Sequence, residues 1–214
     1  MSRREFGEKK RGARRVQPLK TILIVCEGSK TEKIYFERFK ERDSGVKIEV
    51  PTNKFTDPVN LVKFARDYAK KHDISVAEGD SIWVVFDVDQ NRDEEITKAK
   101  ALADDLDIII TPSNPSFELW YLLHYEPSTA HLTNEQLGKK LKKCIPHYAK
   151  NICVFDEIAP TQKLAIKRAG DLNAHHTGKN LYSRSSNPST QVFRVVVHID
   201  KIKTENRANA RARR

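Results

Sequence analysis

A run of five apolar residues at 22–26, followed at once by Glu27 and Gly28, constrains the fold more than any other stretch of the chain. A short continuous apolar run rich in β-branched residues predicts a strand that is buried on both faces, as in a parallel sheet. Gly28 permits a sharp exit from this strand. Open α/β sheets bind ligands at the carboxyl ends of their strands, so Glu27 lies where a functional acid is expected.

A second stretch repeats this arrangement. Residues 82–86 form another apolar run, and Asp87 and Asp89 follow it. Alternate strand residues point to the same face, so these two carboxylates are expected on one face, about 6–7 Å apart along the strand. If the two strands are neighbours, three carboxylates including Glu27 meet, and their repulsion requires a proton or a cation. Such oxygen ligands favour Mg²⁺, with Mn²⁺ as an alternative.

Strands alternate with helices up to about residue 125. Further strands are predicted at 46–50 and 107–111, and the second helix begins with Asp57 as its cap and Pro58 in its first turn. This alternation predicts an α/β fold, with a mostly parallel four-stranded sheet flanked by helices.

The rest of the chain predicts a helical C-terminal extension. Helices are expected over 133–148, 161–175 and 189–203, the last from apolar residues at i, i+3, i+4 and i+7. The predicted organisation is a basic flexible arm (1–18), an α/β core (19–128), a helical extension packed on the core (129–203) and a basic tail (204–214).

Two further acids have both a structural and a functional interpretation. Glu32 follows Ser29 at the spacing of a capping box, which alone would account for an acid there. Glu118 falls in the first turn of a helix predicted to start at Asn114 and Pro115, where the helix dipole favours negative charge. Both helix starts would also face the carboxyl edge of the sheet, so both acids are candidates for the site.

Histidine and cysteine patterns argue against a zinc centre. His124 shares a helix stripe with aromatic residues, which predicts a core histidine with a hydrogen-bonded ring. His175 and His176 are expected at a solvated helix end. The three cysteines are odd in number and lack a C-x-x-C pair, which predicts reduced thiols and no structural zinc; they are Cys26, Cys144 and Cys153.

The net charge of +10 lies at the two ends of the chain. Residues 1–16 carry seven basic and two acidic side chains, and residues 201–214 carry six and one, so each end is +5 and the remainder is neutral. Basic arms attract phosphate backbones, although they can also serve only to keep a protein in solution. The arginines predicted to contact nucleic acid are Arg11, Arg14, Arg15, Arg207, Arg211 and Arg213.

No apolar run approaches the ~20 residues that span a bilayer, and the basic start is not followed by a signal-peptide core. The prediction is a soluble cytoplasmic protein without a membrane partner. Whether the chain forms a homo-oligomer stays open.

Several motifs carry a family resemblance. Residues 25–36 read Val-Cys-Glu-Gly-Ser-Lys-Thr-Glu-Lys-Ile-Tyr-Phe, residues 86–89 read Phe-Asp-Val-Asp, and residues 114–120 read Asn-Pro-Ser-Phe-Glu-Leu-Trp. His124 and an Asn-Pro-Ser-Thr motif at 187–190 follow. Glu-Gly after one strand and Asp-x-Asp after a later strand resemble the Toprim domain of topoisomerases, primases and OLD-type nucleases. Together, over about residues 20–200, the motifs resemble the RloB family of phage-defence proteins.

This resemblance implies a Toprim fold and a divalent-metal phosphodiesterase with Glu27, Asp87 and Asp89 as core acids. It also implies an AAA/ABC-type ATPase partner, as in abortive-infection systems, and these 214 residues hold no Gly-x-x-x-x-Gly-Lys-[Ser/Thr] loop of their own. Glu27 and Glu32 are one residue further apart than the corresponding pair of OLD nucleases, which leaves the role of Glu32 open. The nearest candidates for the lysine of those nucleases are Lys163 and Lys167.

The sequence thus predicts a Mg²⁺-dependent nuclease that acts on DNA or RNA as the effector of an anti-phage defence system. The alternative is a catalytically inactive Toprim-like module that binds nucleic acid or a partner. The predicted metal ligands are Glu27, Asp87, Asp89 and Glu118, and the predicted catalytic set adds Glu32.

Because the charge lies at the ends, trimming residues 1–16 and 201–214 should weaken nucleic-acid binding and flatten its salt dependence. Each lost phosphate contact lowers the slope of log K against log salt by roughly 0.7–0.9. A cautious C-terminal cut stays beyond Lys203, because the helix around Ile199 needs its partners. Salt titrations of full-length and trimmed protein on one oligonucleotide measure the slopes, and superimposable slopes would mean that the ends do not contact the substrate.

Overall fold

The two apolar stretches become the central strands of one sheet. The structure, a computed structural model, describes residues 19–212 except for 29, 43 and 90. The strand order is β2-β1-β3-β4-β5. The strands are β1 (Lys20–Cys26), β2 (Val46–Glu49), β3 (Ser81–Asp87), β4 (Ile109–Asn114) and β5 (Ser189–Thr190). The first four are parallel, and β5 runs antiparallel to β4.

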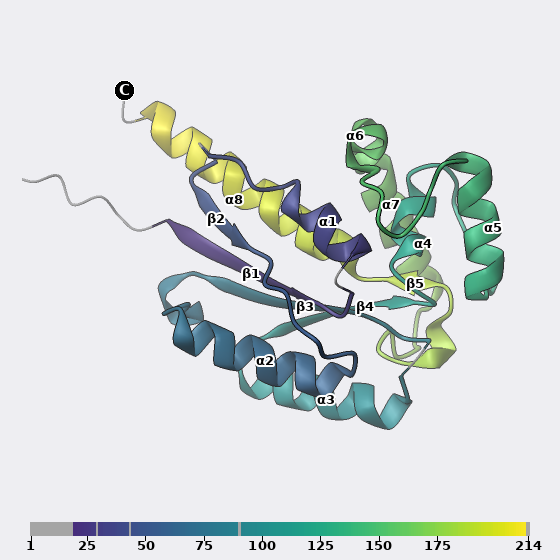
Figure 1. The fold of residues 1–214 in the computed structure, drawn as a ribbon, viewed down its shortest axis with the longest axis horizontal. Helices are drawn as coiled ribbons and strands as arrows, with labels where there is room; N and C mark the ends of the chain where they lie inside the picture. The colour runs from purple at the N-terminus through teal and green to yellow at the C-terminus, as the bar shows by residue number, and fades with distance from the viewer. Residues whose placement is uncertain (1–18, 29, 43, 90, 213–214) are drawn as a thin grey trace, which may run out of the picture.

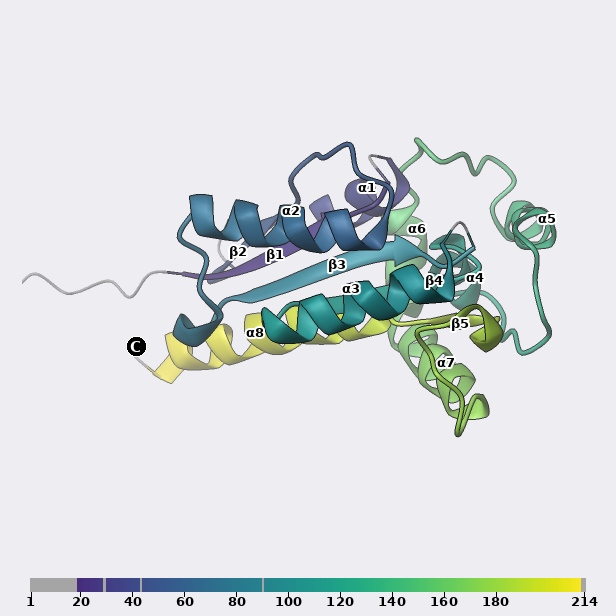
Figure 2. The same cartoon turned by 90° about the horizontal axis from the view of Figure 1, so that it is seen from below.

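Helices cover both faces of the sheet (Figures 1 and 2). Alternate residues of β1 enter different cores: Ile22 and Ile24 lie in one buried cluster, and Leu23 and Val25 in the other. The face of Leu23 packs against α2 (Pro58–Lys71) and α3 (Asp93–Asp105). The buried cluster on the face of Ile22 is formed with residues of α1 (Thr31–Glu37), α4 (Glu118–Leu123), α5 (Asn134–Cys144), α6 (Phe155–Ile158), α7 (Gln162–His175) and α8 (Val192–Ala212). Short 3₁₀ turns occupy Val76–Glu78, Ala159–Thr161 and Arg184–Ser186.

The predicted α/β class is confirmed, and so are two predicted helix starts. Asp57 caps α2, with its carboxylate accepting the N–H of Asn60, and Pro58 is the first residue of the helix. Thr133 caps α5 in a capping box with Gln136. This helix ends at Cys144, however, several residues before the predicted end at Tyr148.

The prediction of four strands is wrong, because a fifth strand forms from residues assigned to the last helix. Ser189 and Thr190 pair with Asn114 and Ser113 of β4, and the Thr190 and Ser113 hydroxyls form a hydrogen bond of 2.8 Å. This pairing extends β4 beyond its predicted end at Thr111. The following helix α4 consequently begins at Glu118 and not at Asn114.

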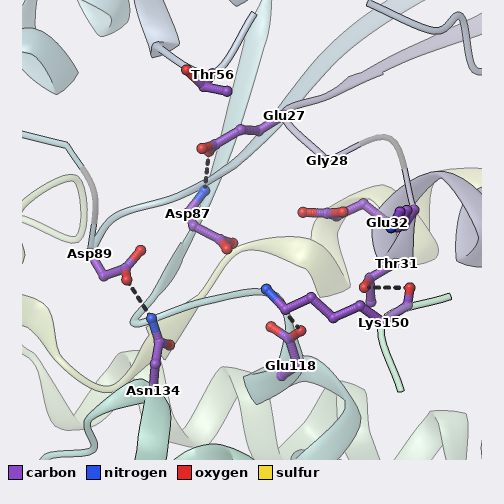
Figure 3. Close-up of a pocket in the computed structure, with 11 residues that line it drawn as sticks. Glu27, Gly28, Thr31, Glu32, Thr56, Asp87, Asp89, Glu118, Asn134 and Lys150 are labelled. Carbon is purple, nitrogen blue, oxygen red and sulfur yellow. Dashed lines mark hydrogen bonds and ion pairs between the residues drawn. The ribbon is translucent and has the colours of Figure 1, made fainter. Parts of the chain in front are cut away.

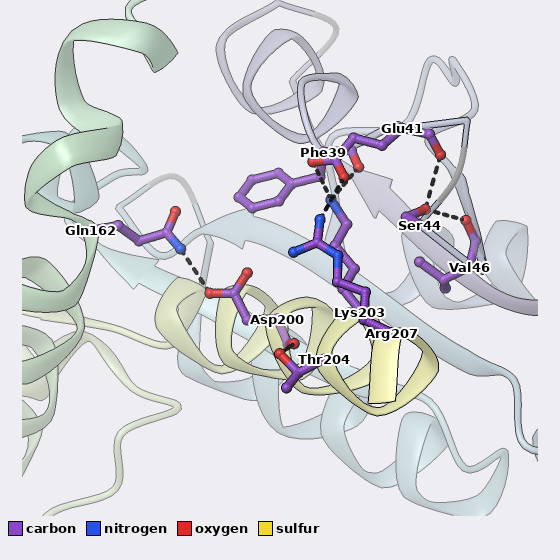
Figure 4. A network of polar contacts seen from close by, with 9 residues as sticks. All are labelled: Phe39, Glu41, Ser44, Val46, Gln162, Asp200, Lys203, Thr204 and Arg207. Atoms are coloured by element: carbon purple, nitrogen blue, oxygen red, sulfur yellow. Dashed lines mark hydrogen bonds and ion pairs between the residues drawn. The ribbon is translucent and has the colours of Figure 1, made fainter. Parts of the chain in front are cut away.

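The predicted end of the last helix at residue 203 is also wrong, because α8 continues to Ala212. Lys203 is 6 % exposed, and its ammonium group donates to the Phe39 carbonyl at 2.8 Å and to Glu41 at 3.0 Å (Figure 4). Asn206 donates to the carbonyl of Gly45, whose positive φ and close approach to that side chain both favour glycine. Residues 204–207 are therefore part of the folded body.

This packing changes the status of the predicted nucleic-acid contacts. Arg207 lies 3.4 Å from Glu41, in an exposed ion pair. Arg211 lies within helix α8. The other four, Arg11, Arg14, Arg15 and Arg213, lie outside the described residues. A C-terminal truncation that leaves the α8 contacts intact has to begin after Arg207, not at residue 201.

The three cysteines are free, with Cys26 buried and Cys153 exposed. No helix within the described part of the chain combines the length and apolar character needed to cross a membrane.

We expect Lys203→Met to lower the free energy of unfolding by about 1–3 kcal/mol, because it leaves the buried carbonyl of Phe39 without this donor. Each 1 kcal/mol corresponds to about 2–4 °C in Tm for a chain of this size. Lys201→Met on the same helix is the matched control, because Lys201 is exposed, and its effect should stay within about 0.5 kcal/mol. Thermal denaturation of the two variants gives the comparison, and equal Tm values would contradict the packing role of Lys203.

Candidate functional site

Glu27 is held at the carboxyl end of β1 by the neighbouring strand. Its backbone N–H donates to the Val85 carbonyl at 2.9 Å, which extends the β1–β3 pairing by one residue. Its carboxylate accepts the backbone N–H of Asp87 at 2.9 Å (Figure 3). The parallel arrangement of β1 and β3 therefore brings Glu27 directly beside the acid that follows β3.

Asp87 and Asp89 are fixed by the segment between β4 and α4. The carboxylate of Asp87 accepts the backbone N–H of Phe117 at 2.8 Å. The backbone N–H of Asp89 donates to the Pro115 carbonyl at 3.3 Å, and its carboxylate accepts a hydrogen bond from the Asn134 amide. Both acids line the same cavity, as the Asp-x-Asp spacing predicts.

Glu32 also enters this cavity, from the first turn of α1. Its carboxylate lies against Gly28, where an added Cβ would come within 2.0 Å of Oε2. A side chain at position 28 would therefore displace the Glu32 carboxylate from its present place. Ser29, the cap of the predicted capping box, lies outside the described residues, and the structure starts the helix at Thr31 with Lys30 as its cap.

Glu118 is buried, and both of its carboxylate oxygens accept hydrogen bonds. The Ser116 hydroxyl donates to Oε2 at 2.8 Å, and the Tyr148 hydroxyl donates to Oε1 at 2.9 Å. Lys150 lies 3.7 Å from the same Oε1. The local donors thus offset the negative charge of Glu118 more fully than the donors near Glu27 and Asp87 offset the charges of those two acids.

Lys150 is a site residue that the sequence did not reveal. Its side chain extends into the cavity among the acids (Figure 3), and Glu118, with Asp87, Glu32 and Asp89, raises its pKa. Its backbone carbonyl accepts the Thr31 hydroxyl at 3.0 Å, which ties this loop to α1. The candidates Lys163 and Lys167 instead lie exposed on α7. Nothing in the local sequence separates Lys150 from the many other lysines, because only the fold brings it here.

The cavity has a volume of about 310 Å³ and an excess of acidic groups. Its lining residues are Glu27, Gly28, Lys30, Thr31, Glu32, Thr56, Asp87, Asp89, Glu118, Asn134 and Lys150. All five acids that the sequence singled out are among them. Two of its uncharged members, Thr56 and Asn134, were not anticipated.

Burial and mutual repulsion weaken the acidity of these groups. Burial, followed by the charges of Glu32, Glu118 and Glu27, raises the pKa of Asp87 well above its usual value. Burial is also the largest cause that raises the pKa of Glu27, to about 7, while the bond from the Asp87 N–H opposes it. The pKa of Glu32 is raised mainly by burial. A positive charge in this cavity would relieve the repulsion.

The potential metal ligands of the cavity are carboxylate, hydroxyl and amide oxygens, which are the atom types that a hard divalent cation prefers. As placed, however, no three His, Cys, Asp or Glu side chains of the described chain form a group that could hold a metal ion. Metal binding would therefore require some of these carboxylates to rotate.

The structure confirms the prediction for His124 and contradicts the prediction for His176. His124 is buried, and its Nδ1 lies 2.9 Å from the Ile158 carbonyl, as predicted for a core histidine. His176 is also buried, with Nε2 2.7 Å from the Pro188 carbonyl, so the prediction of a solvated pair is wrong for this residue. The Asn-Pro motif at 187–188 causes the difference, because it folds back against the end of α7.

Fold and site together define an α/β protein with an acidic cavity at the carboxyl edge of a mostly parallel sheet. A family model described as RloB-like protein matches residues 22–199, so the chain belongs to the RloB-like family. The match includes the motifs at 25–36, 86–89, 114–120 and 187–190. Comparisons with curated proteins and with solved structures found no significant match.

Asp87→Asn should raise the Tm of the metal-free protein at pH 8, because it removes a buried charge while the side-chain oxygen still accepts the Phe117 N–H. Relief of about 1 kcal/mol would give about 2–4 °C. The raised pKa means that the folded state binds this proton more tightly than the unfolded chain, so wild-type stability increases as the pH falls. The advantage of the variant should therefore shrink toward pH 5.

Thermal denaturation in a chelator between pH 5 and 8 measures this difference. Asp105→Asn, at an exposed position of α3, is the control and should change stability by less than about 0.5 kcal/mol. A lower Tm for Asp87→Asn at every pH would contradict the electrostatic account and indicate a purely structural hydrogen-bonding role.

Proposed function

We propose that this protein is a divalent-metal-dependent nuclease that hydrolyses phosphodiester bonds. The observation that carries the proposal is the convergence of five carboxyl groups from four separate segments on one cavity, with the pKa of Glu27 raised to about 7. Buried acids that repel one another destabilise a fold, so such a cluster is more readily explained by chemistry than by structure. The resemblance of the Glu-Gly and Asp-x-Asp motifs of this sequence to those of Toprim nucleases supports the same reaction class.

Glu27, Asp87, Asp89 and Glu118 would hold Mg²⁺ or Mn²⁺. When bound, such an ion polarises the phosphate and lowers the pKa of a bound water. Glu118 already receives two hydrogen bonds, so it fits a peripheral position in this set better than a central one. Glu32 would act at the edge of the site, where its negative charge helps to retain the cation.

The side chains of the cavity suit the remaining requirements of hydrolysis. A carboxylate beside the attacking water can accept its proton, and Glu27 would do so where it does not itself coordinate the ion. The Lys150 ammonium group can stabilise the negative charge that develops on the phosphate oxygens. Asn134, which bonds Asp89, can orient that carboxylate.

We further propose that the nuclease acts as the effector of an anti-phage system together with an ATPase of the AAA/ABC type. Membership of the RloB-like family supports this role. The 214 residues contain no phosphate-binding loop of the Gly-x-x-x-x-Gly-Lys-[Ser/Thr] type, so nucleotide hydrolysis would come from the partner.

The competing function is a non-catalytic module that binds nucleic acid or a partner protein. It is favoured by one observation, the lack of a ready metal-binding group among the described side chains. Metal response separates the two functions. A nuclease should gain thermal stability from Mg²⁺ or Mn²⁺ and lose activity in a chelator, whereas a non-catalytic module should do neither.

Glu27→Gln should reduce cleavage of DNA or RNA by at least about a hundredfold, because loss of even an outer partner of a metal ligand commonly costs 10- to 100-fold. Glutamine keeps the shape and can still accept the Asp87 N–H, so the fold should be retained. Cleavage of a mixed panel of single- and double-stranded DNA and RNA with Mn²⁺ provides the measurement.

Glu94→Gln is the matched control, because Glu94 is exposed on α3 and does not line the cavity. It should cut at the wild-type rate. Equal cleavage by the Glu27→Gln variant and the wild-type protein would refute the assignment of Glu27.

A further inference from the structure

A second cavity of about 330 Å³ adjoins the acidic one. The two share Glu118, Asn134 and Lys150, so a molecule in the second cavity would lie next to the acids. The remaining lining residues are Ser116, Leu137, Gly138, Lys142, Tyr148 and Ala149. Such a volume lies at the lower end of the range for small-ligand pockets, which suits a single nucleotide unit.

The walls of this cavity differ in character from those of the acidic one. Leu137 and Tyr148 form a mainly apolar surface. Ser116 and Asn134 add hydrogen-bonding groups, and Lys142 and Lys150 add two cations. Among the described residues that line it, Glu118 is the one acid, and the Tyr148 hydroxyl and Lys150 already offset its charge. An apolar floor with polar and cationic margins fits a flat heterocycle attached to a phosphate.

Gly138 is a further indication that the second cavity receives a ligand. It lies within helix α5, where glycine costs about 1 kcal/mol relative to alanine. Packing does not require it, because no heavy atom of the described residues, apart from its chain neighbours and nearby helix backbone, lies within 4 Å of the position that its Cβ would occupy. A side chain at this position would instead stand at the wall of the second cavity, so glycine keeps that space open.

We propose that the second cavity receives one nucleobase of a single-stranded nucleic acid, from the nucleotide beside the phosphate in the acidic cavity. This inference rests on the proposed nuclease function. In a duplex the faces of a base are stacked on its neighbours, so only an unpaired or extruded base can enter such a pocket. Contact with the apolar wall requires no particular base, so the substrate class is single-stranded nucleic acid of broad sequence.

The test compares binding of two single strands by the full-length protein in a chelator, so that nothing is cut. One is a labelled ten-residue oligothymidylate, and the other is a ten-unit abasic strand with the same phosphates. Base burial should make the first bind at least about tenfold more tightly, which corresponds to about 1.4 kcal/mol. Equal affinities would overturn the proposal, and this comparison requires no variant.

Gly138→Leu should fill the cavity and remove most of the difference between the two strands. Gly170→Leu is the matched control. Gly170 is also a half-buried helical glycine, it lies on α7, and beyond its own stretch of helix no described heavy atom lies within 4 Å of its Cβ position. Leucine improves helix propensity at both sites, so both variants should stay folded, as far-UV circular dichroism can verify. If Gly138→Leu kept the wild-type preference for bases, the pocket assignment would be wrong.

Two further binding measurements test whether the base must be unpaired and whether a free nucleotide can also supply it. Tenfold weaker binding of a duplex would support the requirement for an unpaired base, and equal binding of the duplex would contradict it. Competition by uridine monophosphate but not by ribose 5-phosphate would support the pocket and extend it to free nucleotides. Cleavage is measured separately with Mn²⁺. A protein that distinguishes bases but cuts nothing would overturn the nuclease proposal alone, whereas a nuclease that binds both strands equally would overturn this one alone.

Discussion

Two hydrogen bonds from backbone N–H groups to carboxylates hold the acidic edge of the sheet together. Asp87 donates its N–H to Glu27, and its own carboxylate accepts the N–H of Phe117. The two bonds connect β1, β3 and the start of α4 in series. The donors belong to the backbone, so the sheet and the start of α4 fix their positions, and each carboxylate is held in the rotamer that accepts the bond. The arrangement of the whole cavity follows from these contacts.

The later half of the chain completes the cavity through its polar side chains. The Asn114 and Asn187 amides bond each other at 3.1 Å, and Asn187 also bonds the backbone of Leu132. These contacts hold the segment that leads into α5 next to the sheet. Beyond α5, Tyr148 and Lys150 return to Glu118. The helical extension is therefore a wall of the site and not a separate appendage.

Local patterns predicted the parts of this structure that depend on neighbouring residues. The apolar runs that precede Glu27 and Asp87 place these acids, because parallel strands must end at one edge. Lys150 and β5 could not be predicted in this way. Lys150 reaches the cavity only after α5 turns the chain back, and Ser189–Thr190 becomes a strand only because β4 offers it a free edge. Contacts between residues so distant in the sequence leave no local pattern.

The direction of α8 has a consequence for the length of any bound polymer. This helix starts beside β5 and ends near Gly45, where β2 begins, so the described chain starts and finishes at the edge opposite the acids (Figure 1). Its 21 residues span about 32 Å. At 3.4 Å for each nucleotide of a stacked strand, roughly nine nucleotides are needed to cover that span. A polymer that contacts both the acids and the C-terminal part of α8 must therefore extend along the body of the protein.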